Sequence, residues 1–253
     1  MKVHRALVEK RRRQILDFIK KESEINVNDL AAKFQVSPIT IRRDLQFLED
    51  NKKVIRFYGG ARLLPNKTAE KTKIDACREQ IARYAAGLVE DGDTIFINTS
   101  STALQMITYI KNKRVTVITN NGKALYTDHD PCVTIVLTGG EVREIKDAMV
   151  GEFAINNLNR VTAKKSFLGC SGLSPENGMT TEVMNEVNVN ELMISRVTGQ
   201  CYILASHEKL GVNSSFISCP AENLTNIITD VYAPESILDA LRAMGVNVMI
   251  AGS

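Results

Sequence analysis

Two adjacent arginines, Arg42 and Arg43, are the first residues whose type and spacing suggest chemistry. Guanidinium groups bind phosphate oxygens and the acceptor edge of guanine, and neighbouring hydroxyl and amide groups bind the same partners. The candidate contact residues of this segment are Ser37, Pro38, Ile39, Thr40, Arg42, Arg43 and Gln46. Taken alone, this segment is better explained as an ordinary amphipathic helix with a solvated arginine pair. The neighbouring segments are therefore needed to distinguish a helix that contacts nucleic acid from an ordinary amphipathic helix.

The same segment carries the signals of a helix start. Ser37 is a favourable N-cap residue, and Pro38 suits the first helical position. At 3.6 residues per turn, Ile41, Leu45 and Leu48 share one face, so this face is expected to pack inward. Upstream, a basic helix is expected over residues 5–21 and a short helix, capped by Asn28, over residues 29–34. Together these elements predict a helix-turn-helix whose recognition helix begins at Pro38.

A small β-wing is expected after the recognition helix. Residues 52–58 alternate loosely between apolar and polar types and end at a glycine pair. The wing is predicted to contact the backbone of a duplex through Lys52, Lys53, Arg56 and Tyr58.

Charge is distributed unevenly along the chain. Residues 1–67 hold 16 Lys and Arg against 8 Asp and Glu, a net charge of +8. The other 186 residues hold 16 against 21, a net charge of −5, which gives +3 for the whole chain. A basic head that binds a polyanion, joined to a mildly acidic body, fits this pattern.

The second half of the chain alternates apolar runs with helical patterns. Strands are expected at 94–98, 114–119, 132–137, 166–170, 201–205, 226–229 and 246–250. Helices are expected at 74–89, 102–110, 182–197 and 234–244. Strands that are apolar throughout and alternate with helices predict an α/β domain with a mainly parallel sheet covered on both faces.

Polar loops follow these strands, at the edge where open parallel sheets bind ligands. Hydroxyls and backbone N–H groups at Ser100 to Thr102 suit an anion, and either Arg143 or Lys209 could close over the same phosphate. The candidate ligand-binding residues are Asn98, Ser100, Ser101, Thr102, Asn120, Gly139, Gly140, Arg143, Gly172 and Lys209. For any one loop, Ser, Asn and Gly are at least as well explained by turns and caps.

Composition sets the limits of these interpretations. With 253 residues, 44% hydrophobic and 24% charged, the chain suits a small domain at 1–62, a linker at 63–73 and a larger domain at 74–253. No apolar run is long enough to span a membrane and no signal peptide is recognisable, so a cytoplasmic protein is expected. The five cysteines are scattered and the three histidines lie near no cysteine pair, so neither a metal site nor a cofactor is predicted.

At this point the sequence resembles a known family. The run Val36 to Leu45, the pair Leu48-Glu49 and the run Arg56 to Ala61 resemble the N-terminal signature of the DeoR family of bacterial transcriptional regulators. Members combine a winged helix-turn-helix with a sensor domain similar to the sugar-phosphate isomerase and CoA-transferase-like fold. The chain departs from the family pattern at Asn98 and Ser100, where aspartate and glycine are usual, and at Ser206-His207-Glu208, which replaces Asp-x-Ser.

The resemblance implies a sequence-specific regulator of transcription. It would bind double-stranded operator DNA as a homodimer or homotetramer, repress a carbohydrate-metabolism operon and respond to a phosphorylated sugar or related metabolite. It would not be an enzyme. The alternative is a sugar-phosphate isomerase or transferase-like enzyme with an added nucleic-acid-binding head, for which the candidate general bases are Glu141, Glu182, Glu186 and Glu208. A third possibility, a nonspecific nucleoid-type binder, predicts similar affinity for every duplex.

Overall fold

The computed structural model describes residues 2–22, 24–50, 53–57, 59–63, 67–143 and 146–252. Its internal contacts divide the chain into two compact units, residues 1–72 and 73–253. Two of the predicted DNA-contacting residues, Lys52 and Tyr58, lie outside the described residues. Among the residues that the structure describes, no helix is long and apolar enough to cross a membrane.

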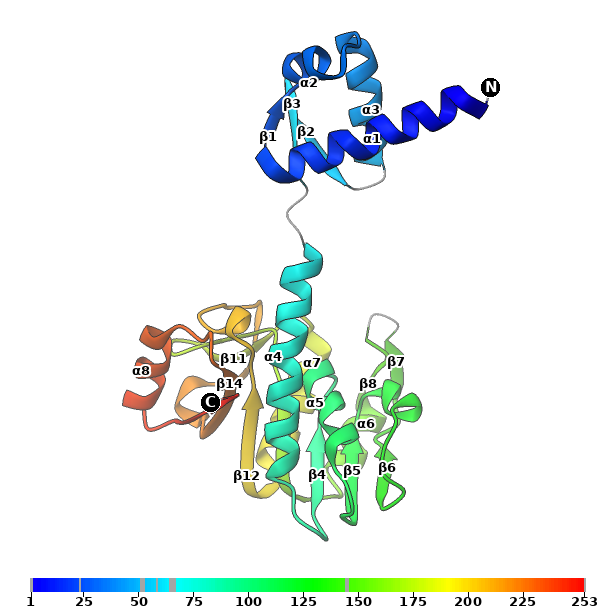
Figure 1. The fold of residues 1–253 in the computed structure, drawn as a ribbon. Helices are drawn as coiled ribbons and strands as arrows, with labels where there is room; N and C mark the ends of the chain where they lie inside the picture. Colours follow the sequence, from blue (N-terminus) through cyan, green and yellow to red (C-terminus); the bar gives the residue numbers. More distant parts are fainter. Residues whose placement is uncertain are drawn as a thin grey trace. The chain divides into compact units, whose positions relative to one another are not determined.

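The N-terminal unit is a winged helix-turn-helix (Figure 1). Its elements are α1 (Lys2–Glu22), β1 (Glu24–Asn26), α2 (Val27–Phe34), α3 (Pro38–Asp50), β2 (Val54–Phe57) and β3 (Gly60–Leu63). The strands form an antiparallel sheet in the order β1-β3-β2. The inward face predicted for the recognition helix is confirmed, because Ile41, Leu45 and Leu48 are buried in the core of this unit.

The two helix starts differ in how well they follow from sequence. Ser37 Oγ accepts a hydrogen bond from the Thr40 N–H at 3.3 Å, as predicted for the cap of α3. The predicted cap of α2 was wrong, because Asn26 rather than Asn28 caps it, with Oδ1 accepting from the Asn28 N–H at 2.8 Å. The reason is β1, which pairs Asn26 with Gly60 of β3 and so delivers the chain to the helix earlier.

The C-terminal unit is built on a seven-stranded sheet in which every neighbouring pair is parallel. In sheet order the strands are β15 (Asn247–Ala251), β14 (Asn226–Asp230), β12 (Val197–Leu204), β9 (Ala163–Gly169), β4 (Thr94–Ile97), β5 (Val115–Thr119) and β6 (Val133–Leu137). Each of these strands overlaps a predicted one, so the predicted α/β class and mainly parallel sheet are confirmed.

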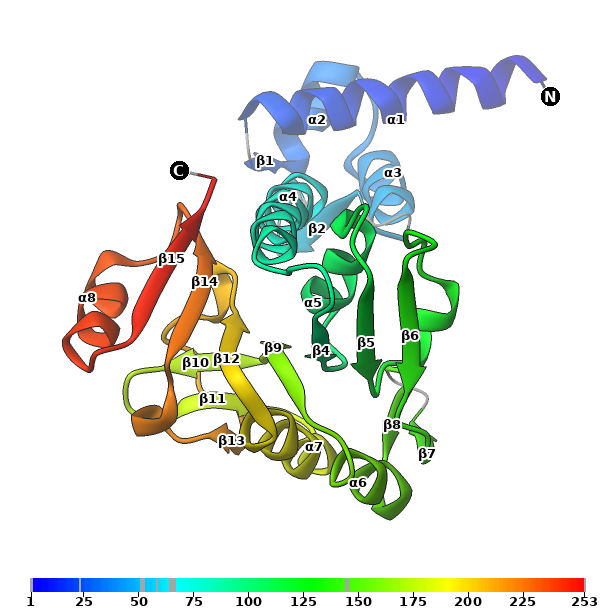
Figure 2. The same ribbon diagram turned by 90° about the horizontal axis from the view of Figure 1, so that it is seen from below.

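Helices cover both faces of this sheet (Figure 2). One face carries α4 (Lys67–Gly87), α5 (Ser101–Met106) and η1 (Ile107–Tyr109), whose apolar side chains share a core with Ile95 and Val117. The other carries α6 (Glu152–Leu158), α7 (Met184–Ser195) and α8 (Glu235–Ala243), packed around Phe96 and Leu168. Helix α4 begins at Lys67, earlier than the expected start near Ile74.

The sequence analysis did not predict the short elements that follow strands β5, β6, β9 and β12 along the chain. They are η2 (Gly122–Tyr126), β7 (Glu141–Arg143), β8 (Ala148–Val150), β10 (Gly172–Ser174), β11 (Gly178–Thr181), η3 (His207–Lys209), β13 (Phe216–Cys219) and η4 (Ala221–Asn223). Strands β7 and β8 form an antiparallel pair, and β10, β11 and β13 form a second small sheet. These short elements determine which of the predicted polar loops lie next to one another.

Candidate functional site

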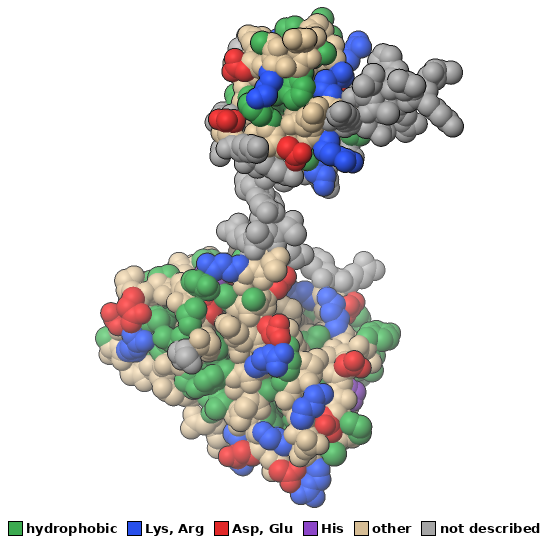
Figure 3. All heavy atoms as spheres, viewed as in Figure 1, with side chains coloured by type: hydrophobic (Ala, Val, Ile, Leu, Met, Phe, Trp, Pro, Cys, Tyr) green, Lys and Arg blue, Asp and Glu red, His purple; other side chains and the backbone are tan. Residues whose placement is uncertain are grey.

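The outward face of α3 is open to solvent. Ile39 is 60% exposed, and Arg42 and Arg43 are also exposed. Neither arginine forms a hydrogen bond or ion pair with a side chain that the structure describes. Lys and Arg side chains stand on the surface of this unit in Figure 3. The arrangement presents cations and one apolar side chain from a single helix.

Two arginines of α1 have a different role. Arg11 Nε and Arg12 Nε donate to the two carboxylate oxygens of Asp44 at 2.6 and 2.8 Å, and Asp44 is only 2% exposed. The Arg12 guanidinium also stacks 3.8 Å from the centre of the Phe47 ring. These contacts clamp α1 onto the inner side of α3. Part of the basic charge counted in the sequence is therefore internal, a division that charge counting could not detect.

Other predicted contact residues lie where α3 meets the wing. Gln46 Nε2 donates to Asp50 Oδ1 at 2.9 Å, and Gln46 Oε1 accepts from Arg56 Nη1. Arg56 also lies 3.7 Å from Glu49. Lys53, at the start of the wing, is exposed. The described members of the predicted set thus lie on α3, at its start or in the wing, and their contact with DNA stays a prediction.

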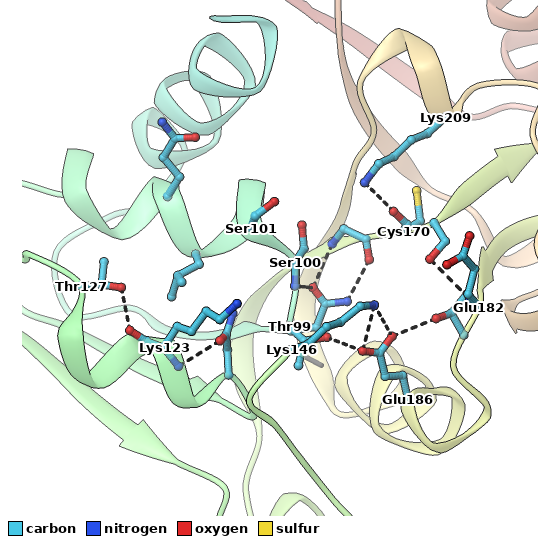
Figure 4. A pocket seen from close by; sticks show the side chains of 17 residues that line it. Thr99, Ser100, Ser101, Lys123, Thr127, Lys146, Cys170, Glu182, Glu186 and Lys209 are labelled. Carbon is cyan, nitrogen blue, oxygen red and sulfur yellow. Dashed lines mark hydrogen bonds and ion pairs between the residues drawn. The ribbon is translucent and has the colours of Figure 1, made fainter. Parts of the chain in front are cut away.

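A polar pocket of about 620 Å³ opens in the C-terminal unit (Figure 4). Four of the predicted ligand-binding residues line it, namely Asn98, Ser100, Ser101 and Lys209. The others, Thr102, Asn120, Gly139, Gly140, Arg143 and Gly172, are not part of its lining. Of the predicted polar loops, those at residues 98–102, 119–122, 169–172 and 206–211 contribute to the pocket, and the loop at residues 138–143 does not.

The excluded residues have structural roles. A side chain at Gly140 would collide with the Val150 carbonyl, and one at Gly172 would collide with the Val212 carbonyl. Arg143 stands on β7, where its Nη2 lies 3.3 Å from Glu141 Oε2. Of the two cations expected as alternatives for closing over the phosphate, Lys209 lines the pocket and Arg143 does not.

Asn98 and Ser100 serve the architecture as well as the lining. Asn98 Nδ2 donates to the Gly169 carbonyl and to Asn190 Oδ1, both at 2.9 Å. Its Oδ1 accepts from the N–H groups of Gly169 and Ser100 at 3.0 and 3.2 Å. Ser100 Oγ caps α5 by accepting from the Ala103 N–H at 3.4 Å. The Asn98 amide therefore connects the ends of β4 and β9 to α7.

A carboxylate that sequence reasoning considered only as a general base lies at the centre of the pocket wall. Glu186 is buried and accepts hydrogen bonds from the Thr99 and Thr181 hydroxyls, each at 2.8 Å. Lys146 Nζ lies 3.1 Å from both Glu186 oxygens, and Figure 4 shows the two side chains facing each other. Lys146, Thr99 and Thr181 were missed because their proximity depends on the fold rather than on any local motif.

Two further cations and one thiol complete the lining. Lys209 Nζ donates to the Cys170 carbonyl at 2.6 Å, and Lys123 extends from η2 on the opposite side (Figure 4). Burial raises the pKa of the Cys170 thiol to about 11. At neutral pH this thiol is protonated and is no nucleophile. The pocket therefore offers three ammonium groups, several hydroxyls and the carboxylates of Glu182 and Glu186, a set suited to binding a polar anion.

Comparison with known proteins agrees with these features. Residues 11–67 match the DeoR-like helix-turn-helix domain, and residues 75–231 match the DeoR C-terminal sensor domain. The HTH-type transcriptional regulator GolR of Listeria innocua is 30% identical over 95% of this chain and 98% of its own length. The lactose phosphotransferase system repressor of Staphylococcus aureus is 29% identical over 90% of this chain and 94% of its own.

Among solved structures, ribose 5-phosphate isomerase A from Methanocaldococcus jannaschii is 16% identical over 53% of each chain, with a TM-score of 0.37. GolR and the lactose phosphotransferase system repressor each match nearly the whole chain and are named as regulators of transcription, which favours regulation over the enzyme considered as the alternative. The chain belongs to the DeoR family of DNA-binding transcriptional regulators.

Proposed function

We propose that this regulator represses a carbohydrate-metabolism operon and that a phosphorylated sugar, bound in the pocket of the C-terminal unit, changes its affinity for operator DNA. The observation that carries the proposal is the pocket lining, in which Lys123, Lys146 and Lys209 accompany hydroxyls and a buried carboxylate. Support also comes from relatives, because one of them is named as the repressor of a lactose phosphotransferase system.

The two kinds of polar group suit the two parts of such a ligand. Lys123, Lys209 and the hydroxyls of Ser100 and Ser101 supply donors for phosphate oxygens. Glu186 supplies only acceptors when ionised, and two of its present donors, beside the Lys146 ammonium, are hydroxyl groups. A sugar hydroxyl can make the same kind of hydrogen bond. We therefore place the phosphate at the Ser100 and Ser101 hydroxyls, between the two lysines, and the sugar hydroxyls toward Glu186.

A thermal-shift screen of phosphorylated sugars tests the ligand. We expect one class of sugar phosphate to raise the Tm of the full chain, and we expect this increase to disappear in Lys123→Ala and Lys209→Ala. Arg143→Ala is the matched control, because it also removes a cation but lies outside the pocket lining. An equal increase in all three variants, or none with any phosphorylated sugar, would refute the assignment.

Binding to DNA is tested on α3 and on the wing separately. Arg43→Ala should lower the preference for the operator over a scrambled duplex by about 1–3 kcal/mol, the value of a good base contact. Lys53→Ala should instead weaken both duplexes alike and reduce the dependence of affinity on salt. Unchanged discrimination in Arg43→Ala would show that this residue does not read bases.

Control by the ligand requires that it bind one state of the regulator better than the other. We propose a homodimer or homotetramer, since a two-fold assembly presents paired recognition helices to paired half-sites. Light scattering of the chain with and without operator DNA measures the assembly directly. A monomer bound to a single half-site would contradict this part of the proposal.

A further inference from the structure

We propose that Cys77, His207 and Asp230 form a binding site for a zinc-class divalent metal ion. One ligand atom from each residue lies within 4.8 Å of the other two. Within the described part of the chain, this is the one group of three such side chains. The residues come from α4, η3 and the end of β14, so they are distant in sequence and meet only through the fold.

The donor set has the chemistry that zinc prefers. Thiolate sulfur, imidazole nitrogen and carboxylate oxygen are its usual protein ligands, and three of them leave a fourth position for water. Zinc–ligand distances of about 2.0–2.3 Å place tetrahedral ligand atoms roughly 3.3–3.8 Å apart. Side-chain movements of about 1 Å therefore convert the observed cluster into a coordinating one.

Hydrogen bonds already orient two of the three ligands. His207 Nδ1 lies 2.9 Å from Asp230 Oδ1, and Asp230 Oδ2 accepts from the His207 N–H at 2.8 Å. The carboxylate also accepts from the Tyr232 N–H at 3.0 Å. A carboxylate has about four acceptor positions, and the fourth of Asp230 faces the Cys77 thiol, whose proton a metal ion would replace. The edge of the Tyr232 ring packs against the imidazole, with ring centres 5.6 Å apart, and limits its rotation.

Burial gives the cluster a closed side and an open side. Cys77 is 2% exposed and Asp230 is fully buried, whereas the His207 side chain is 24% exposed. A metal ion can enter past the imidazole and reach the two buried ligands. The next residue of α4, Arg78, pairs with Glu208 of η3, so the same two elements are already in contact beside the cluster.

A bound ion would join α4 to η3, the short helix that carries Lys209 into the pocket. Binding only the folded state, it would stabilise the C-terminal unit by mass action. This consequence does not depend on the identity of the effector. The metal-site proposal can thus be refuted while the proposed control by a sugar phosphate stands, and the sugar-phosphate proposal can be refuted while the metal site stands.

The test uses the full chain, treated with a chelator, dialysed and titrated with Zn²⁺ or Co²⁺. We expect about one equivalent of tightly bound Zn²⁺, and a thiolate-to-cobalt charge-transfer band when Co²⁺ is bound. At a hundredfold excess of Zn²⁺ over its Kd, Tm should rise by about 5 °C. Absence of the band and of the Tm increase in the unsubstituted chain would overturn the proposal.

Three variants locate the ligands. Cys77→Ser should abolish the cobalt band, and His207→Gln should weaken binding by tenfold or more. Cys132→Ser is the control, because Cys132 is an exposed thiol close in sequence to His129 and Asp130. A band retained in Cys77→Ser but lost in Cys132→Ser would assign the metal to that surface segment and refute our site. Should Cys77→Ser misfold, as judged by circular dichroism, undiminished affinity in His207→Gln would refute it equally.

Discussion

Replacing Asn98 by aspartate tests the hydrogen bonds that hold the pocket together. The Asn98 amide nitrogen donates to two acceptors, the Gly169 carbonyl and Asn190 Oδ1. In Asn98→Asp an oxygen takes its place and faces both acceptors without a proton. Each lost hydrogen bond costs about 1 kcal/mol, and each buried acceptor left unpaired adds roughly 1–3 kcal/mol. Allowing for rotation of the Asn190 amide, we expect a loss of about 3–5 kcal/mol at neutral pH.

The loss should depend on pH in a defined direction. A buried carboxyl group facing two acceptors is stabilised by its proton, so its pKa in the folded variant lies above the unfolded value of about 3.9. When the pH is below the folded pKa, the carboxyl group carries its proton and can donate to one acceptor, so the variant recovers part of its stability. As the pH rises through the folded pKa, this contribution is lost. Asn98→Asp should therefore be closer to the parent near pH 5 than near pH 8.

Thermal unfolding of both chains across this pH range is the assay. The expected loss corresponds to a decrease in Tm of roughly 10 °C near pH 8. Asn121→Asp is the matched control, because Asn121 is also a buried pocket residue but its Oδ1 acts as an acceptor, from the Lys123 N–H at 3.1 Å. Its Tm should stay close to that of the parent. Near-equal melting of Asn98→Asp and the parent at every pH would refute the reasoning.

Three further predictions concern other buried or exposed groups. Asp44→Ala removes the carboxylate that fixes α1 to α3 and should cost about 2 kcal/mol, seen as faster hydrogen exchange in α3; unchanged exchange would contradict the clamp. Burial acts to raise the pKa of Asp93, but hydrogen bonds, foremost from Lys165, hold it below the ordinary value of 3.8. The stabilisation by ionised Asp93 is fully present above pH 3.8 and is lost as the pH falls through the lowered folded pKa. In Asp93→Asn, Tm should therefore depend less on pH in the acid range. Iodoacetamide should label Cys132, the exposed thiol, before any buried one, as mass spectrometry of peptides can show.

Features that depend on local sequence could be predicted. The inward face of α3 follows from helical periodicity, and its start at Pro38 follows from capping preferences. The parallel strands follow from continuous apolar runs, because strands covered on both faces need no polar alternation. The start of α2 was misplaced because strand β1, only three residues long, gives too short a pattern to recognise.

Features that depend on distant side chains could not be predicted. Arg143 was placed at the pocket because it follows a strand of the parallel sheet, but the β7–β8 pair takes it elsewhere. Lys146 and Glu186 meet although no motif links them. The basic run of α1 looked uniform, and only the fold shows that Arg11 and Arg12 face a buried carboxylate. Sequence patterns report which residues are polar but not which polar residues become neighbours.

Gly169, the last residue of β9, lies very close to Ser100, which follows β4 and caps α5. A methyl group added at Gly169 would overlap both Cβ and Oγ of Ser100. An alanine at position 169 is therefore compatible only with glycine at position 100, and Ser100→Gly should rescue Gly169→Ala when the two are combined. Homologous regulators aligned to this chain should accordingly be compared at both positions as one unit, since either residue in isolation misrepresents the space that a ligand can occupy.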